Sequence, residues 1–307
     1  MRIGIVDLDT SHPGSWIPIE RELGLEIVGL WDGGEIHPAG YAEQFAKEHN
    51  ISRVFLSIDE MVGEVDCAVI HACNWDTHID KAGPFVEAGK SVLIDKPLAG
   101  NTRDLKQLVE WTKSASGGRI TGGSSLRFCV ETRDWLAQPV DERGTPDTVL
   151  CGCGVDEFNY GIHAYSMLSG IMGPGIQSVK HLGKGVQHRI QVNWADGRMG
   201  FLVVGTAETW LPFYTSITTE KTSVQYQADS AKLYRALLEA VVPYLSGNTN
   251  EPPLPMDVLI ESELCAIAAR RSWLEGNREV SIAELSESGD GYNGRAFAIK
   301  YRKLRYS

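Results

Sequence analysis

Asp95-Lys96-Pro97 directly follows the apolar run 91–94, which is typical of a buried strand. The carboxyl end of a parallel strand is where an open α/β sheet presents groups to a ligand. A lysine there can hydrogen-bond a substrate hydroxyl, and a desolvated lysine has a lowered pKa that permits proton transfer. A solvated lysine in a turn ended by proline is the structural alternative, and position alone does not decide between them.

A second candidate is His163, which lies in the small and apolar stretch 159–166. An imidazole suits a general base near neutral pH. A hydrogen-bonded core histidine is the common alternative in such a stretch. By itself, the position of His163 favours that alternative.

A third candidate is Asp32, which ends the strand-like run 26–31. About 20 residues after its first turn, a dinucleotide-binding domain places the carboxylate that binds the adenosine ribose hydroxyls. Gly33 and Gly34 follow Asp32, so no basic side chain stands beside it in the sequence. A carboxylate without a basic neighbour favours NAD over NADP.

The elements expected to position these residues alternate between strand and helix in the first third of the chain. Short apolar strands separated by helices indicate parallel βαβ units, and right-handed crossovers then give a doubly wound sheet. We predict strands at 3–6, 26–31, 67–71 and 91–94 and helices at 41–48 and 77–88.

From residue 147 onward the pattern changes to paired strands. Residues 188–194 alternate between polar and apolar, Asp196-Gly197 supplies a hairpin turn, and 199–204 returns from it. Apolar positions then share one face in helices predicted at 233–245 and 260–274. The expected fold is a Rossmann domain at 1–121, followed at 122–307 by an α+β domain with a large, mostly antiparallel open sheet.

Composition narrows the class of protein. The chain has 307 residues and a formal net charge of −11, which argues against nucleic acid or an anionic membrane as partner. No apolar run approaches the roughly 18 residues of a membrane span, and no signal peptide is visible, so we expect a cytoplasmic protein. The scattered cysteines do not form a disulfide framework, and we interpret them as ordinary buried thiols: Cys67, Cys73, Cys129, Cys151, Cys153 and Cys265.

Several ordered segments together resemble the glucose–fructose oxidoreductase/inositol dehydrogenase (Gfo/Idh/MocA) family. Residues 92–99 look like its Glu-Lys-Pro signature with Asp95 in place of the glutamate, and Tyr160-Gly161-Ile162-His163 looks like its catalytic-histidine segment. Further similarity lies at 76–78, 87–90, 172–175, 178–179 and 272–276, so that the resemblance covers nearly the whole chain.

The resemblance implies NAD(P)-dependent oxidation or reduction of a sugar, cyclitol or related hydroxyl compound. Lys96 would hydrogen-bond the reacting hydroxyl, and His163 would take its proton as hydride passes to the nicotinamide. A cis Lys96–Pro97 peptide and a homodimer or homotetramer assembled through the second domain are also implied. No metal is expected, and NAD is expected rather than NADP.

The resemblance also implies two sets of contacts. The substrate contacts would be Lys96, Arg127 and His163. Tyr160 and Trp75 are further candidates by residue type, since an aromatic ring suits a sugar face, and packing in the core is the open alternative for both. The cofactor contacts would be Leu8, Asp9, Thr10, Ser11, His12, Asp32, Ala72, Cys73, Asn74, His78, Asp95 and Lys96.

Two departures from the family pattern concern the chemistry. The first turn, Asp7-Leu8-Asp9-Thr10-Ser11-His12, has none of the three glycines of the usual phosphate-binding turn. A carboxylate about 4 Å from a phosphate charge costs around 4 kcal/mol at an effective dielectric near 20, so at least one aspartate must point away. Four residues before His163, Asn159 replaces a common catalytic aspartate, and Asp156 or Glu157 could substitute for it.

Three other interpretations remain open at this point. The first is an enzyme that uses tightly bound NAD for transient oxidation during elimination or glycoside cleavage. The second, motivated by the missing glycines, is a cofactor-free binding or regulatory protein derived from the family. In the third, Asp7, Asp9 and His12 would bind a divalent metal, since they form a plausible set of nitrogen and oxygen ligands.

Overall fold

The computed structural model describes residues 1–114, 118–285 and 291–306, and its chain divides into two compact units. Unit 1 comprises Met1–Gly123, Leu238–Met256 and Asn293–Ser307. Unit 2 comprises Ser124–Leu237 and Asp257–Tyr292. Because two later segments pack with the first, the units do not correspond to a single cut in the sequence.

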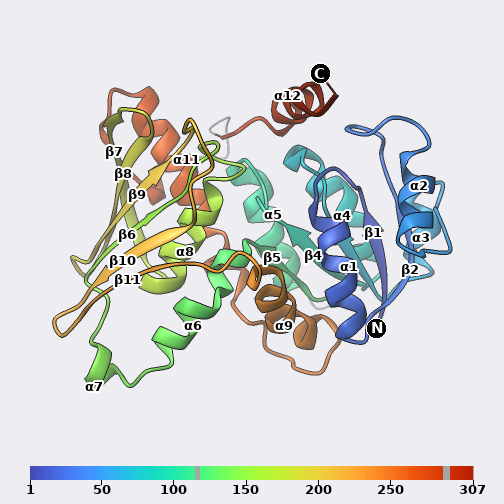
Figure 1. Ribbon diagram of the computed structural model, residues 1–307, viewed down its shortest axis with the longest axis horizontal. Helices are drawn as coiled ribbons and strands as arrows, with labels where there is room; N and C mark the ends of the chain where they lie inside the picture. Colours follow the sequence, from blue (N-terminus) through green and yellow to red (C-terminus); the bar gives the residue numbers. More distant parts are fainter. Residues whose placement is uncertain (115–117, 286–290, 307) are drawn as a thin grey trace. The chain divides into compact units, whose positions relative to one another are not determined.

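Unit 1 contains a five-stranded sheet in the order β2-β1-β3-β4-β5, and every neighbouring pair is parallel. The order reverses on either side of β1, which confirms the predicted doubly wound sheet (Figure 1). Its strands are β1 (Arg2–Val6), β2 (Glu26–Trp31), β3 (Cys67–Ile70), β4 (Ser91–Asp95) and β5 (Ile120–Gly123).

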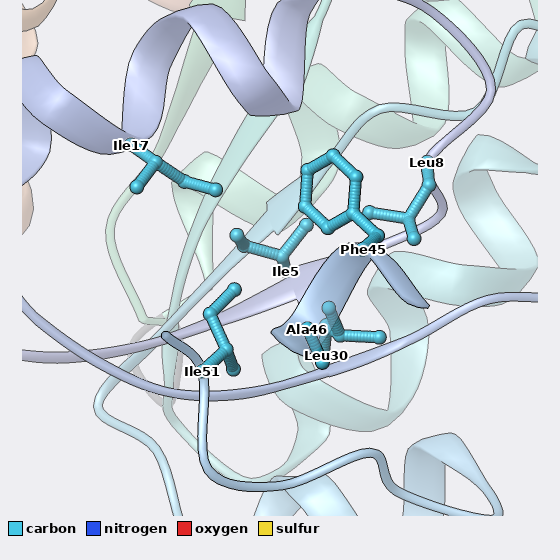
Figure 2. Packing of buried hydrophobic residues seen from close by; sticks show 7 residues of the cluster. All are labelled: Ile5, Leu8, Ile17, Leu30, Phe45, Ala46 and Ile51. Atoms are coloured by element: carbon cyan, nitrogen blue, oxygen red, sulfur yellow. The ribbon is translucent and has the colours of Figure 1, made fainter. Parts of the chain in front are cut away.

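Alternation along β1 explains how helices pack on this sheet. Ile5 packs with Ile17 and Phe45 in one buried apolar cluster (Figure 2). A Cβ at the preceding Gly4 would lie 2.4 Å from the Met61 sulfur, so the glycine lets the Met61 side chain pack directly against this face of the strand. The helices are α1 (His12–Glu22), α2 (Tyr41–Glu48), α3 (Ile58–Val62), η1 (Trp75–Thr77), α4 (His78–Glu87), α5 (Thr102–Lys113) and α12 (Gly294–Tyr306), with α9 (Leu233–Leu245) contributing to both units.

Unit 2 contains a seven-stranded sheet in the order β11-β10-β6-β9-β8-β7-β12. The β6–β9 pair is parallel and the other pairs are antiparallel, which confirms the predicted mostly antiparallel sheet. The hairpin predicted between residues 188–194 and 199–204 is also confirmed, since these two strands pair antiparallel. The strands are β6 (Thr148–Gly152), β7 (Ile176–Lys184), β8 (His188–Trp194), β9 (Met199–Val204), β10 (Tyr214–Thr218), β11 (Ser223–Gln227) and β12 (Glu279–Ser281).

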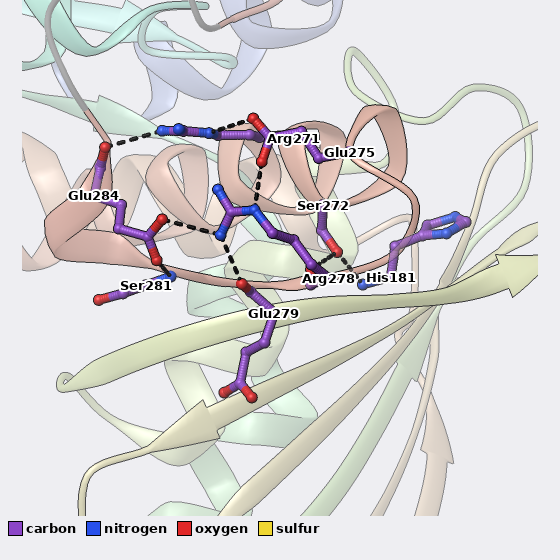
Figure 3. A network of polar contacts seen from close by, with 8 residues as sticks. All are labelled: His181, Arg271, Ser272, Glu275, Arg278, Glu279, Ser281 and Glu284. Carbon is purple, nitrogen blue, oxygen red and sulfur yellow. Dashed lines mark hydrogen bonds and ion pairs between the residues drawn. The ribbon is translucent and has the colours of Figure 1, made fainter.

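A polar network secures the short edge strand β12 in unit 2. Arg278 bonds to the carboxylates of Glu275 and Glu284 and to the Glu279 carbonyl, and Ser272 bonds to both the Arg278 carbonyl and the His181 amide (Figure 3).

The helices of this unit are η2 (Ser125–Phe128), α6 (Val130–Leu136), α7 (Val140–Arg143), α8 (Ile162–Met172), α10 (Met256–Leu259), α11 (Glu261–Leu274) and η3 (Ile282–Glu284), where α10 begins on the last residue of a unit 1 segment.

All six cysteines are buried free thiols, as predicted. Among the described residues, no helix has the length and apolar character needed to span a membrane.

Candidate functional site

The carboxyl edge of the unit 1 sheet brings together acidic and imidazole side chains. Asp7, Asp32 and His71 directly follow β1, β2 and β3, and Asp95 is the last residue of β4. These strands are neighbours and run in one direction, so their ends share one edge of the sheet.

Asp7 begins the first turn in a left-handed conformation with φ 64°. Aspartate is one of the few residues other than glycine that adopts this conformation readily. Its Oδ1 accepts the Gly33 amide at 3.0 Å, and its Oδ2 pairs with Lys81 Nζ at 2.6 Å. Lys81 therefore neutralises this buried carboxylate, and Asp7 takes the backbone geometry for which the usual turn employs glycine.

Asp9 lies fully buried beneath the same turn. Its Oδ2 accepts the Cys73 amide at 2.8 Å, while its Oδ1 has no hydrogen-bond partner among the described residues. Burial, followed by the neighbouring charge of Asp7, raises the pKa of Asp9 to about 7. This carboxyl group is therefore partly protonated at neutral pH.

Asp32 is half-buried at the end of β2, where its Oδ1 accepts the Leu8 amide at 3.2 Å. Burial and the charge of Asp7 raise its pKa. The hydrogen bond fixes the position of this carboxylate relative to the first turn.

Asp95 is buried and bridges two imidazoles. Its Oδ2 lies 2.6 Å from His12 Nδ1 and 3.0 Å from His71 Nδ1, and its Oδ1 accepts the Lys96 amide at 2.7 Å. Burial opposes ionisation, but the two histidines hold the pKa of Asp95 well below its usual range. Because His12 pairs with Asp95, the described side chains do not gather Asp7, Asp9 and His12 as one ligand set.

Lys96 is 8 % exposed and begins the loop after β4. The Lys96–Pro97 peptide is cis, as the resemblance implied. At the start of α1, Thr10 Oγ1 accepts the His12 amide at 3.2 Å, and Ser11 occupies the cap position without a side-chain cap bond. The first turn thus ends at a helix N-terminus, where amide groups favour an anion.

The loop after β3 is held mainly by structural contacts. His78 is fully buried, with Nε2 2.8 Å from the Ala72 carbonyl and Nδ1 3.0 Å from the Leu98 carbonyl, so it links two loops. Asn74 donates to Glu35 at 2.8 Å, and the buried Trp75 ring packs against Phe297 with centroids 5.1 Å apart.

His163 lies near the start of α8 in unit 2 and is 5 % exposed. Its Nδ1 is 2.7 Å from Ser124 Oγ. The rings of Tyr160 and Phe213 meet it edge-on, with centroids at 5.4 and 5.1 Å. A histidine ring oriented by a hydroxyl at one nitrogen is of the kind that can serve as a general base.

The loop before α8 distributes its acidic groups among structural contacts. Asp156 accepts the amides of Phe158 and Tyr160 at 2.9 and 3.0 Å, and Glu157 lies 3.6 Å from His188. Asn159, at the position of the common catalytic aspartate, is half-buried. Tyr160 receives a hydrogen bond from Trp210 at 2.8 Å.

Arg127 lies in η2 and is 7 % exposed. Burial lowers its pKa to about 10, and the charges of Glu263 and Glu261 oppose that shift. On α8, a Cβ at Gly170 would lie 3.1 Å from the Arg127 carbonyl, so the glycine permits close packing. The buried Arg127 Nη2 has no hydrogen-bond partner among the described residues.

Sequence reasoning missed three residues of these sites. In the sequence, His71 is only the end of a predicted strand and Lys81 only part of a predicted helix, and no pattern marks Ser124. The available signals were a histidine ending an apolar strand and a lysine on the helix that follows it, but the pairing of Ser124 with His163 depends on tertiary packing.

Residues 3–118 match a protein-family model described as "Oxidoreductase family, NAD-binding Rossmann fold". A trans-1,2-dihydrobenzene-1,2-diol dehydrogenase from Danio rerio is 31 % identical over 70 residues, which cover 22 % of this chain and 21 % of the relative. A scyllo-inositol 2-dehydrogenase (NADP(+)) from Bacillus subtilis is 35 % identical over 75 residues, covering 24 % and 23 %. The aligned segments thus span about a fifth of these relatives.

Solved structures with the same fold extend over most of the chain. A scyllo-inositol dehydrogenase from Lactobacillus casei with bound NAD(H) and scyllo-inositol aligns with a TM-score of 0.77 at 16 % identity, covering 92 % of this chain and 99 % of that one. A myo-inositol dehydrogenase from the same organism, in complex with NAD(H) and myo-inositol, has a TM-score of 0.76 at 14 % identity and covers 92 % and 96 %.

Proposed function

Because residues 3–118 carry the NAD-binding Rossmann fold of the Gfo/Idh/MocA oxidoreductase family, we propose that this protein is an NAD-dependent oxidoreductase of a sugar, cyclitol or related hydroxyl compound. The family match carries the proposal, since it includes the edge that holds Asp32, Asp95 and Lys96. The names of the relatives, which include inositol dehydrogenases, support this substrate class.

The first turn fits a dinucleotide despite its lack of glycine. Lys81 and the Gly33 amide take up the charge of Asp7, and Asp9 is partly protonated at neutral pH. The N-terminus of α1 follows directly and offers amide groups to the pyrophosphate. Asp32 would bind the adenosine ribose hydroxyls.

In the proposed reaction, bound nicotinamide supplies the hydride acceptor or donor. Lys96 hydrogen-bonds the reacting oxygen, and its low exposure favours proton sharing over solvation. His163 takes the hydroxyl proton in the oxidative direction, with its ring oriented by Ser124. Asn159 orients a substrate hydroxyl in place of the common aspartate.

Titration calorimetry with NAD and NADP tests whether the protein binds a dinucleotide. A denaturation assay for nucleotide retained through purification complements it. We expect NAD to bind more tightly than NADP, followed by reduction of NAD in the presence of a member of a polyol and sugar panel. If neither nucleotide binds at millimolar concentration and none is retained, the protein is not a dehydrogenase, and the cofactor-free binding protein is the better interpretation.

A further inference from the structure

Helix α12 returns to unit 1 and packs on the edge of the sheet where the proposed cofactor would lie. Its buried Ala298 joins Ile36 and Cys73 in an apolar cluster, and Phe297 packs on Trp75. Ile36 belongs to the loop after β2, and Cys73 to the loop after β3. These strands flank β1 on opposite sides, so α12 bridges the two loops at the reversal of strand order.

The start of α12 fits closely against the loop after β3. A Cβ at Gly294 would lie 2.7 Å from Asn74 Oδ1 and 2.8 Å from the amide nitrogens of Trp75 and Asp76, so only glycine fits there. Asp76 also accepts the Arg295 amide at 3.1 Å, which caps the helix. The helix is therefore seated in one specific register.

The last turns of α12 bond to the loop after Asp32. Arg302 Nη1 donates to the Glu35 carbonyl at 2.8 Å and to the Gly34 carbonyl at 3.4 Å. Gly34 has φ 71°, so this loop turns sharply just after the carboxylate that would bind the ribose. Arg302 thus fixes the path of the backbone that leaves Asp32.

A buried histidine connects α12 with the first turn. His37 is 1 % exposed, its Nε2 lies 3.0 Å from the Leu8 carbonyl, and its Nδ1 meets the Tyr306 hydroxyl. A carbonyl only accepts, so Nε2 carries the proton and Nδ1 accepts from Tyr306. Burial, with the charges of Arg305 and Arg302, lowers the pKa of His37 and keeps the ring neutral in this arrangement.

We infer that α12 positions the adenosine half of the cofactor site, with Arg302 and Tyr306 as positioning residues that hold the loop after Asp32 and, through His37, the first turn. This inference rests on the proposed function. In a doubly wound sheet the dinucleotide lies at the reversal of strand order, with its adenosine ribose on the carboxylate that ends β2. Both segments on that side are tied to α12, and neither tie involves Lys96.

The test compares binding of two halves of the dinucleotide, ADP-ribose and nicotinamide mononucleotide, by calorimetry. The Arg302→Gln/Tyr306→Phe double variant removes both ties, and Lys300→Gln on the exposed side of the same helix is the matched control. We expect the Kd for ADP-ribose to rise about tenfold in the double variant, in line with the loss of the modest hydrogen bonds that Arg302 and Tyr306 make. The Kd for nicotinamide mononucleotide should not change, and the KM for NAD should rise while kcat stays constant.

Equal losses for both half-molecules, or an unchanged Kd for ADP-ribose, would overturn the inference. If the double variant does not fold, Tyr306→Phe alone carries the test, because it removes one oxygen atom and leaves the packing of Ala298 intact. Failure of the wild-type protein to bind NAD would refute the proposed function together with this inference. Wild-type binding with no difference between variant and control would refute the inference alone.

Discussion

Replacement of Asp9 by asparagine tests how an acidic first turn tolerates its own charge. Burial and the charge of Asp7 raise the pKa of Asp9 from 3.8 to about 7, against the opposing effects of the Cys73 amide and Lys81. Asparagine keeps an oxygen for the Cys73 amide but has no charge. The variant therefore removes the titration of this side chain while it keeps the bond to the Cys73 amide.

The sign of the effect follows from the raised pKa. Between pH 3.8 and about 7 the folded protein keeps the Asp9 proton and the unfolded chain loses it, so wild-type stability falls as pH rises. Each pKa unit corresponds to about 1.4 kcal/mol, so the whole shift costs at most about 4 kcal/mol by neutral pH. The Asp9→Asn variant should gain stability over wild type by up to that amount between pH 4 and pH 8.

Urea unfolding at several pH values measures this gap, with Asp59→Asn at an exposed position as control. A gap between Asp9→Asn and wild type that stays constant over the pH range would refute the reasoning. Cofactor affinity gives a second readout, because a negative charge on Asp9 beneath the first turn would repel a bound pyrophosphate, and a like charge about 10 Å away weakens binding about tenfold at an effective dielectric near 20. Wild-type affinity for NAD should therefore fall between pH 6 and pH 8, and that of the variant should not.

Three further predictions concern the other site residues. Lys96→Ala and His163→Ala should each lower turnover at least about a hundredfold, while the affinity for NAD changes by no more than a few-fold. Steady-state kinetics measures the turnover and calorimetry the affinity. Near-normal turnover in either variant would contradict the role proposed for that residue. Asp32→Ala should weaken the binding of NAD and reduce the ratio of NAD affinity to NADP affinity. An unchanged ratio in calorimetric titrations would mean that this carboxylate does not bind the ribose. Arg127→Met should shift the midpoint of urea unfolding, because it removes a buried charge that interacts electrostatically with Glu263 and Glu261, and an unchanged midpoint would contradict that.

Periodicity predicts much of this fold because each strand carries its own signal. The apolar run 91–94 and the alternation of 188–194 correspond to β4 and β8, and the Asp-Gly turn at 196–197 sets the hairpin between β8 and β9. The predicted helix 41–48 coincides with α2. These features depend on neighbours within a few residues, so the sequence contains what is needed to predict them.

Side-chain partners could not be predicted in the same way. His71 reads as one more residue of a buried strand, and its contact with Asp95 requires that β3 and β4 be neighbours. The tie between His37 and Tyr306 joins positions 269 residues apart. Side-chain pairs of this kind depend on which elements pack together, and a single sequence has no local pattern that indicates them.

The first turn shows how a site can replace glycine without losing its geometry. Glycine is common in such turns because the backbone must bend through a left-handed conformation and approach a phosphate closely. Here Asp7 adopts that conformation, and its carboxylate bonds to the Gly33 amide and to Lys81 instead of facing a phosphate. Because Asp7 and Lys81 depend on each other, Lys81→Met should weaken NAD binding more than Asp7→Asn does, since it leaves an unpaired negative charge beneath the turn. Equal losses of NAD affinity in the two variants, measured by calorimetry, would show that the ion pair maintains the conformation of the turn and does not act through the charge beneath it.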